Sequence, residues 1–524
     1  MILRPRAGVD IIVRAGTVFD GLGRSGVERD VVITAGRITS LTARPSDRAA
    51  IEIDAKGLAV APGFIDIHSH GDGTLWDDPR AESLIRQGIT TIVVGQDGSS
   101  RAPRATGDGR EDARHQYATF AELWTDLAKL APAVNVASMV GLGTVRDVVI
   151  GGDDRRATAA ELERMVALVR AALADGACGA SSGLEYTPGA FAPLDELVAL
   201  CMPLAARTLP YATHMRNEDD RLIEAIDEAI AVARGAGCPL QISHLKTQGP
   251  RNWKKLDAAF ARIAEARAAK VDVAFDRYPY VAYQTGLTNL FPVWSRDGST
   301  QAFLVRLRDS ATAARIEREA REKVELIGGW DNVMIASVAD STDRAAEGAR
   351  LGAYAGARGV DPYAMAIALL ERSRGNVGMV GFAMSEENLD RILAHPEGMV
   401  CSDGGAFAID GPARRGHPHP RALGTYPRVL ARYVRERKAL TLSQAIHKMS
   451  AQPASRIRLR DRGRLAVGLA ADVVVFDPAT VQDRATYAEP FQYPVGIKAV
   501  IVNGTIALLD GTRTQKHAGR GLRV

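Results

Sequence analysis

The sequence predicts an α/β fold in which a closed, TIM-type (β/α)8 barrel carries a small sheet domain built from both ends of the chain. Eight short apolar runs alternate with stretches of helical periodicity between about residues 61 and 455, as in parallel strands joined by helices. Short β-like runs with Gly, Asp and Asn turns precede this region and return after it. The 524 residues leave room for a barrel of about 250 residues or more and an accessory domain.

The sheet domain is predicted to take residues 1–60 as its N-terminal part and residues 456–524 as its C-terminal part. Its strand-like runs lie at 11–13, 31–33, 36–38, 468–477 and 499–504. Two unrelated β segments are the alternative that this pattern leaves open.

The barrel is predicted over residues 61–455. Its strands are expected within 61–72, 90–98, 134–141, 179–186, 211–214, 240–246, 271–278 and 399–404, with helices over 159–175 and 219–234. Two further strand-like segments, 332–337 and 376–382, leave the identity of the seventh strand open. A stretch near 288–343 reads as an insertion, which either covers the active site or is purely structural.

The first barrel strand ends in two histidines, His68 and His70, after a Pro62-Gly63 turn. Their i, i+2 spacing on a strand points both imidazoles to the same side. An isolated His-x-His favours a half-buried strand with two polar positions. Later apolar runs also end in His, Glu or Asp, however, and the strand ends of a parallel barrel meet on one face.

Seven such residues are candidate metal ligands: His68, His70, Asp97, Glu185, His214, His244 and Asp403. Four of the 10 histidines of the chain fall at strand ends in this way. Imidazole and carboxylate together suit Zn²⁺, as one or two divalent ions. Such a metal activates water and polarises a carbonyl, and Asp403 is the candidate general base and acid. A turn Asp in Ser-Asp-Gly-Gly is the alternative for Asp403.

The composition of the chain limits the classes of partner and the compartment that we expect. The net charge of +4, from 66 basic and 62 acidic residues without a polybasic run, argues against nucleic acid. No apolar run approaches the roughly 20 residues of a membrane span, and the N-terminus lacks a signal peptide's apolar core, so we expect a cytoplasmic protein. The 4 cysteines are far apart and are expected to be small core residues, with Cys401 worth attention because it precedes Asp403 by two positions.

The run Pro62-Gly63-Phe64-Ile65-Asp66-Ile67-His68-Ser69-His70, with His214, His244 and Asp403, resembles the amidohydrolase superfamily. Further segments are similar to N-acyl-D-amino-acid deacylases (D-aminoacylases): Gly183-Leu184-Glu185-Tyr186-Thr187-Pro188-Gly189, Thr213-His214-Met215-Arg216-Asn217-Glu218, Ile242-Ser243-His244-Leu245-Lys246, Tyr278-Pro279-Tyr280 and His417-Pro418-His419-Pro420-Arg421. The resemblance implies a metal-dependent hydrolase on a (β/α)8 barrel with a β-sandwich domain. It also implies that Lys246, with Tyr186 and Tyr278 or Tyr280, clamps the substrate carboxylate; packing roles are the alternative.

Two departures from the deacylase pattern affect the site. The triplet Gln96-Asp97-Gly98 stands where D-aminoacylases often carry Asn-Cys-Gly with a metal-binding cysteine. Glu185 lies where other superfamily members place a bridging carboxylate, so we hypothesise that Glu185 bridges, with Asp97 as the alternative. Gly141-Leu142-Gly143 stands where some relatives have a central histidine.

The sequence thus predicts a zinc-dependent hydrolase of a linear C–N amide bond in a small molecule, with N-acyl-D-amino acids as the expected substrates. Another amide (a D-peptide, cyclic imide or ureide) and a non-catalytic binding protein on the same fold are the alternatives. The preferred side chain and the oligomeric state, a homo-oligomer included, stay open. Three residues of one Pro-rich loop are expected at the rim or in structural roles, with a substrate role open: His417, His419 and Arg421. The remaining histidines are expected to face solvent: His115, His395, His447 and His517.

Overall fold

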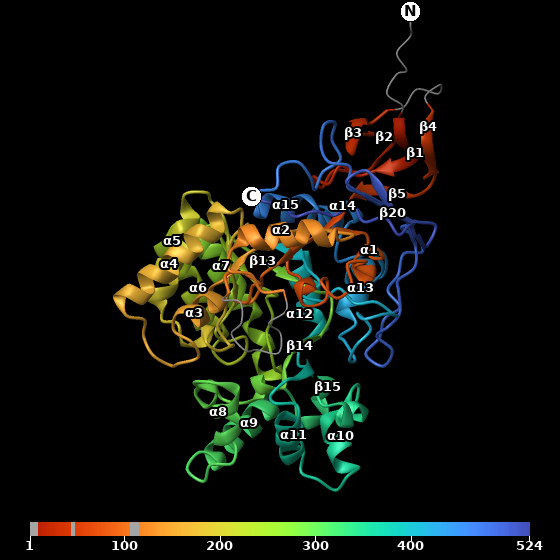
Figure 1. Ribbon diagram of the computed structural model, residues 1–524. Coiled ribbons are helices and arrows are strands. Elements are labelled where there is room, and N and C mark those ends of the chain that lie inside the picture. Colours follow the sequence, from red (N-terminus) through yellow and green to blue (C-terminus); the bar gives the residue numbers. More distant parts are fainter. Residues whose placement is uncertain (1–8, 43–47, 105–114) are drawn as a thin grey trace, which may run out of the picture.

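The computed structural model describes residues 9–42, 48–104 and 115–524 of the chain. Residues 1–8, on which the expectation about a signal peptide rests, lie outside the described part. Figure 1 shows the terminal sheet at one end of the molecule and the helices α8–α11 at the other.

Strands from both ends of the chain share one nine-stranded sheet, so the prediction of a common terminal domain is confirmed. The link is β5, which pairs with β1 in parallel and with β18 in antiparallel orientation. The order is β21-β20-β19-β18-β5-β1-β2-β3, with β4 also on β1. The strands are β1 (Val9–Val18), β2 (Val27–Thr34), β3 (Arg37–Ser40), β4 (Ala49–Asp54), β5 (Ala59–Pro62), β18 (Val473–Phe476), β19 (Ile497–Val502), β20 (Thr505–Leu509) and β21 (Thr512–Arg513).

The middle of the chain forms the predicted barrel of parallel strands. In β7, for example, all six residues are buried, as expected for a strand covered on both faces. The strands are β6 (Phe64–Asp66), β7 (Ile89–Val94), β8 (Asn135–Ser138) continued by β9 (Val140–Gly141), β10 (Ala180–Gly183), β11 (Tyr211–His214), β12 (Leu240–Ile242), β13 (Val273–Arg277) and β17 (Gly398–Val400).

The barrel closes between β17 and β6, just beyond the ends of both strands. The amide of Asp403 donates to the carbonyl of His68 (2.9 Å), and the amide of His70 donates to the carbonyl of Gly404 (2.9 Å). The closing hydrogen bonds therefore fall on the residues of the expected site and fix their backbones. The β17 strand is the eighth member of the ring, and the two strand-like segments near 332–337 and 376–382 lie outside it.

Helices follow most barrel strands, and their starts are encoded locally. Thr158 caps α4 in a capping box with Glu161, and Thr441 caps α14 in the same way with Gln444. The helices of this layer are α1 (Glu82–Ile85), α2 (Phe120–Leu130), α3 (Leu142–Val149), α4 (Ala159–Ala174), α5 (Leu194–Ala205), α6 (Leu222–Ala236), α7 (Leu256–Ala268), α12 (Glu386–Ala394), α13 (Arg421–Arg428) with a π-helical continuation over Val429–Glu436, α14 (Leu442–Met449) and α15 (Ala451–Arg456).

Between β13 and β17 the chain leaves the barrel and builds a three-stranded antiparallel sheet with its own helices. Its sheet order is β14-β16-β15. The elements are β14 (Ala282–Gly286), α8 (Thr300–Arg306), α9 (Ala313–Leu326), β15 (Val333–Val338), α10 (Leu351–Gly356), α11 (Pro362–Arg372) and β16 (Val377–Phe382). In the described part of the chain, no helix combines the length and apolar character that a bilayer crossing requires.

Candidate active site

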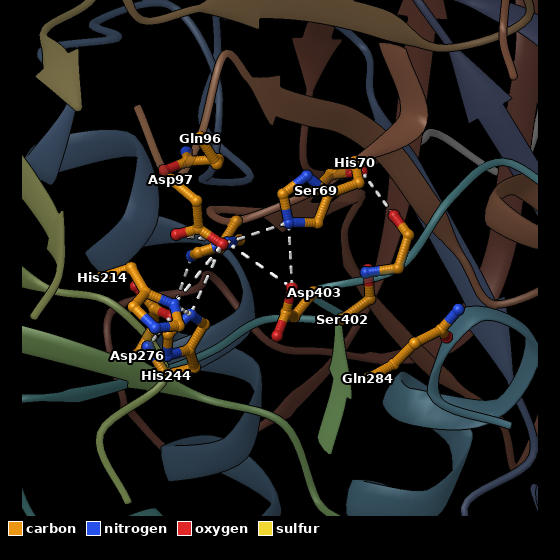
Figure 2. A network of polar contacts seen from close by, with 12 residues as sticks. Ser69, His70, Gln96, Asp97, His214, His244, Asp276, Gln284, Ser402 and Asp403 are labelled. Carbon is orange, nitrogen blue, oxygen red and sulfur yellow. Dashed lines mark hydrogen bonds and ion pairs between the residues drawn. The ribbon is translucent and has the colours of Figure 1, made fainter. Parts of the chain in front are cut away.

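The structure brings all seven predicted ligand residues to the carboxyl ends of barrel strands. Figure 2 shows five of them close together: His70, Asp97, His214, His244 and Asp403. His214 is the last residue of β11, and the others follow the ends of their strands by two to four positions. These strands are β6 for His68 and His70, β7 for Asp97, β10 for Glu185, β12 for His244 and β17 for Asp403.

One side of the cluster consists of His68, His70 and Asp403, with Asp97 facing them. The Nε2 atom of His70 lies 3.1 Å from Asp403 Oδ1 and 3.4 Å from Asp97 Oδ2. The Nε2 atom of His68 lies 3.5 Å from Asp97 Oδ1 and 3.6 Å from Asp403 Oδ1. Each of the four residues offers one ligand atom, and these four atoms all lie within 4.8 Å of one another. They are close enough to hold a single metal ion.

The other side consists of His214 and His244, and Asp97 faces this side as well. The Oδ2 atom of Asp97 lies 3.6 Å from His244 Nε2 and 3.9 Å from His214 Nδ1, and these two ring nitrogens are 3.1 Å apart. Asp97 therefore contacts all four histidines. Glu185 lies farther out, with Oε2 3.4 Å from His214 Nε2, the ring nitrogen that His214 does not turn toward Asp97.

A carboxylate stands behind three of the four histidines. Besides Glu185 behind His214, Glu218 Oε1 lies 3.1 Å from His244 Nδ1, and Asp276 Oδ1 lies 3.6 Å from His68 Nδ1. At His214, where Glu185 accepts from the outer nitrogen, the ring proton is held there and the inner nitrogen's lone pair is free for a metal. The outer nitrogen of His244 also lies 2.7 Å from the Lys246 ammonium. Glu218 also accepts from Lys246 Nζ at 2.6 Å.

Three site residues have left-handed backbones, which non-glycine residues adopt at a cost of about 1–3 kcal/mol each. The φ angles are 51° for Asp97, 36° for His244 and 50° for Asp403. The turn at Asp97 packs against glycine: a Cβ on Gly141 would lie 2.5 Å from the carbonyl oxygen of Gly98, and a Cβ on Gly143 2.8 Å. Gly141 and Gly143 thus leave room for the turn that aims Asp97.

The donor set fits a divalent metal. Both ring nitrogens of His68 and the Oδ1 atom of Asp97 are buried without a hydrogen-bond partner among the described residues. Burial alone would lower the pKa of His70, but the adjacent Asp403 and Asp97 carboxylates raise it to about 9. Burial would likewise raise the pKa of Asp97, whereas His68 and His244 hold it well below its usual range. The cluster is therefore a concentration of negative charge and imidazole that favours a cation.

Asp403 is held in its ionised form from two directions. Its Oδ2 atom lies 2.6 Å from Arg421 Nη1, and its Oδ1 atom faces His70. Although burial raises the pKa of a carboxyl group, Arg421 and His70 hold the pKa of Asp403 far below its usual range. One oxygen therefore faces the cluster while the other is neutralised by a buried guanidinium.

The comparisons with known proteins agree with this geometry. The sequence profile of the amidohydrolase family matches residues 52–362 and 405–508. The chain belongs to the amidohydrolase family. An N-acyl-D-glutamate deacylase from Alcaligenes xylosoxydans xylosoxydans is 38% identical over 98% of this chain and 96% of that protein, and a D-aminoacylase from the same organism is 35% identical over 98% and 97%. The crystal structure of an N-acyl-D-glutamate deacylase from Bordetella bronchiseptica, complexed with zinc and a phosphonate inhibitor, superposes with a TM-score of 0.85 at 34% identity, covering 99% of this chain and 100% of that one.

The amidohydrolase site opens into a cavity of about 560 Å³. Lys246, Tyr186 and Tyr278 line it. Tyr280 is not among the lining residues: it packs edge-on against His419, and its hydroxyl donates to the carbonyl of Pro420 (3.4 Å). Strand β14 forms part of the cavity wall, so the excursion between β13 and β17 covers the site.

Three functional side chains were not singled out from the sequence in the roles they take. Glu218 ends no apolar run, although it belongs to the quoted Thr213–Glu218 motif. Asp276 does end one, Val273-Ala274-Phe275, but is not among the candidate ligands of the sequence analysis. Arg421 was expected at the rim and is instead buried against Asp403. The two histidines of its loop are structural: His417 contacts the carbonyl of Tyr487 and His419 that of Ala282. The four cysteines are buried free thiols, as predicted.

His115, His395, His447 and His517 lie away from the metal-ligand cluster. His395 packs 4.6 Å from the ring of Phe260, and His447 and His517 contact backbone carbonyls through Nδ1. His115 lines an outer cavity next to the site and is exposed.

Proposed function

We propose that this amidohydrolase cleaves the linear amide bond of N-acyl-D-amino acids, releasing a carboxylate and a free D-amino acid, with Zn²⁺ as its metal. The observation that carries the proposal is the convergence of four histidines on Asp97, with Asp403 beside them. The names of the relatives that match nearly the whole chain supply the substrate class.

His68, His70, His214, His244, Asp97 and Asp403 are the residues that would hold one or two ions. Zinc in such a site lowers the pKa of water to about 7 and polarises the carbonyl under attack. The contacts of Asp97 with both pairs of histidines support Asp97, rather than Glu185, as the shared ligand. Glu185 then orients His214.

Asp403 is our candidate for the proton-transferring group. Its ionised carboxylate takes the proton of the attacking water and returns it to the leaving nitrogen, a role that requires a carboxylate at the reacting centre. The ion pair with Arg421 keeps this carboxylate ionised and fixes its direction.

The substrate carboxylate is assigned to Lys246, with the Tyr186 and Tyr278 hydroxyls near it. Lys246 is 2% exposed and shares the Glu218 carboxylate with His244, so its ammonium is fixed rather than mobile. The Tyr278 hydroxyl is buried and has no hydrogen-bond partner among the described residues, which leaves it available to a ligand.

The test is hydrolysis of paired N-acetyl-D- and N-acetyl-L-amino acids by the zinc-loaded and the chelator-treated protein. We expect turnover of D-substrates only, lost on chelation and restored by Zn²⁺. Hydantoin and dihydrouracil serve as cyclic controls. Stoichiometric zinc without turnover of any amide would point to a binding protein, and turnover of the cyclic substrates alone would reassign the reaction.

A further inference from the structure

A second cavity lies behind Glu185, on the side away from the metal-ligand cluster. Its volume is about 660 Å³, and its wall includes Glu185, Asn289, Arg296 and Lys323. Glu185 and Asn289 line both this cavity and the active-site cavity, so these two residues form the partition between them.

Arg296 is a buried cation on this wall that forms no ion pair with any described residue, although the more distant Glu185 carboxylate acts on its charge. Its exposed fraction is 9%, and no carboxylate oxygen lies within 4 Å of its guanidinium among the described residues. Its Nη2 atom donates to the backbone carbonyl of Glu185 (3.0 Å), while Nε is buried without a partner. Burying a guanidinium in this way is costly unless an anion accompanies it.

The other cations of the cavity are already compensated or exposed. Lys323 Nζ lies 2.6 Å from Asp219, and an Asp220 oxygen accepts from Arg251. Arg221 lies on the same wall and is exposed to solvent. Among the described cations of this wall, Arg296 is therefore the one that is buried and has no ion pair.

We propose that Arg296 makes this cavity a binding site for a small carboxylate anion. A single guanidinium with one free nitrogen edge matches a monoanion, whereas a phosphate dianion would require a second uncompensated cation. Asn289 Nδ2 already donates to Glu185 Oε2 (3.1 Å), which turns the Glu185 carboxylate toward His214 and away from the incoming anion.

The site communicates with the metal-ligand cluster through one residue. Arg296 holds the main chain of Glu185, and Glu185 holds the Nε2 atom of His214. A carboxylate at Arg296 therefore acts on His214 without entering the active-site cavity. The anion site does not depend on the proposed function.

The test is acetate binding to the zinc-loaded protein, measured by saturation-transfer NMR on the acetate methyl group. All variants can also bind acetate at the metal. The difference in acetate binding between wild type and Arg296→Met therefore reports on the second site alone. We expect Arg296→Met to weaken that component at least about tenfold, as the loss of a charged hydrogen bond does. Arg296→Lys should keep part of it, and the exposed control Arg221→Met should keep all of it.

Equal acetate binding by wild type and Arg296→Met at equal zinc content would overturn the proposal. If Arg296→Met does not fold, wild-type crystals soaked in sodium bromide decide the matter: an anomalous peak beside the guanidinium supports the site, and its absence overturns it. Titration with inorganic phosphate tests the choice of a carboxylate over a phosphate, because phosphate binding stronger than acetate binding would also contradict the proposal. Binding of acetate without any amide hydrolysis would leave the site intact and remove the proposed function instead.

Discussion

His214 and His244 each have a carboxylate against the ring nitrogen that faces away from Asp97, whereas both acidic contacts of His70 use its Nε2 atom. The side chain of His70 is 40% exposed, against 6% and 2% for His214 and His244. The side of the cluster with His214 and His244 is therefore buried. On the other side His68 is 1% exposed, but His70 opens to the cavity, and both histidines share the Asp97 and Asp403 carboxylates, so we call this the open side. We expect the buried side to hold a metal more tightly, and the open side to carry the proton transfer.

The largest expected effect belongs to the open side. Asp403→Asn keeps the shape of the side chain but removes the base, so kcat should fall by about 10²–10⁴-fold. Zinc on the buried side should remain, because Asp403 has no contact with His214. Metal analysis and kcat measured together check this. Full zinc loss in Asp403→Asn would show that the two sides do not bind independently.

Asp97→Asn should affect both sides at once. Its carboxylate is the only acidic group among the described residues that contacts all four histidines, so an amide there removes the shared negative charge. We expect zinc content to fall below one ion per chain, with a matching loss of activity. Retention of full zinc by Asp97→Asn together with its loss in Glu185→Gln would restore Glu185 as the bridging residue.

Glu218→Gln tests whether the buried side depends on its backing carboxylate. Removing such an outer partner weakens metal binding by about 10–100-fold, because His244 and Lys246 lose the negative charge that they share. Competition with a chromogenic chelator measures the affinity. Glu228→Gln is the matched control: Glu228 lies on α6 and pairs with Arg216 at 2.9 Å, away from the histidines. Equal affinities of the two variants would make Glu218 a partner of Lys246 only.

The barrel and the meeting of the candidate ligand residues on one face could be predicted from the sequence because both depend on local signals. An apolar run that ends in His68 or Asp403 marks a strand and its carboxyl end together, and parallel topology brings those ends to one face. The roles of Glu218 and Arg421 depend instead on tertiary packing: Glu218 acts on a histidine of the next strand, and Arg421 reaches Asp403 from the start of α13. No periodicity reports such contacts, which is also why the positions of Glu185 and Asp97 could not be ranked in advance.

The smallest expected effect concerns the strands beneath the two sides. At the start of β17, on the open side, Lys448 donates to the carbonyls of Gly398 (2.7 Å) and His395, whereas the start of β12 is held by Arg456 on the carbonyl of Leu240. Burial lowers the pKa of Lys448 from 10.5 to about 8. Between these two values the unfolded chain binds the extra proton, so the free energy of unfolding rises with pH there; below pH 8 the cost of burying the charge is constant. From pH 7.5 to 9 this contribution should amount to about 1 kcal/mol.

Urea unfolding should show that Lys448→Met loses this increment while Arg456→Met keeps it. An unchanged pH dependence in Lys448→Met would mean that Lys448 stays protonated in the folded protein, and that both sides of the barrel are anchored by permanent charges.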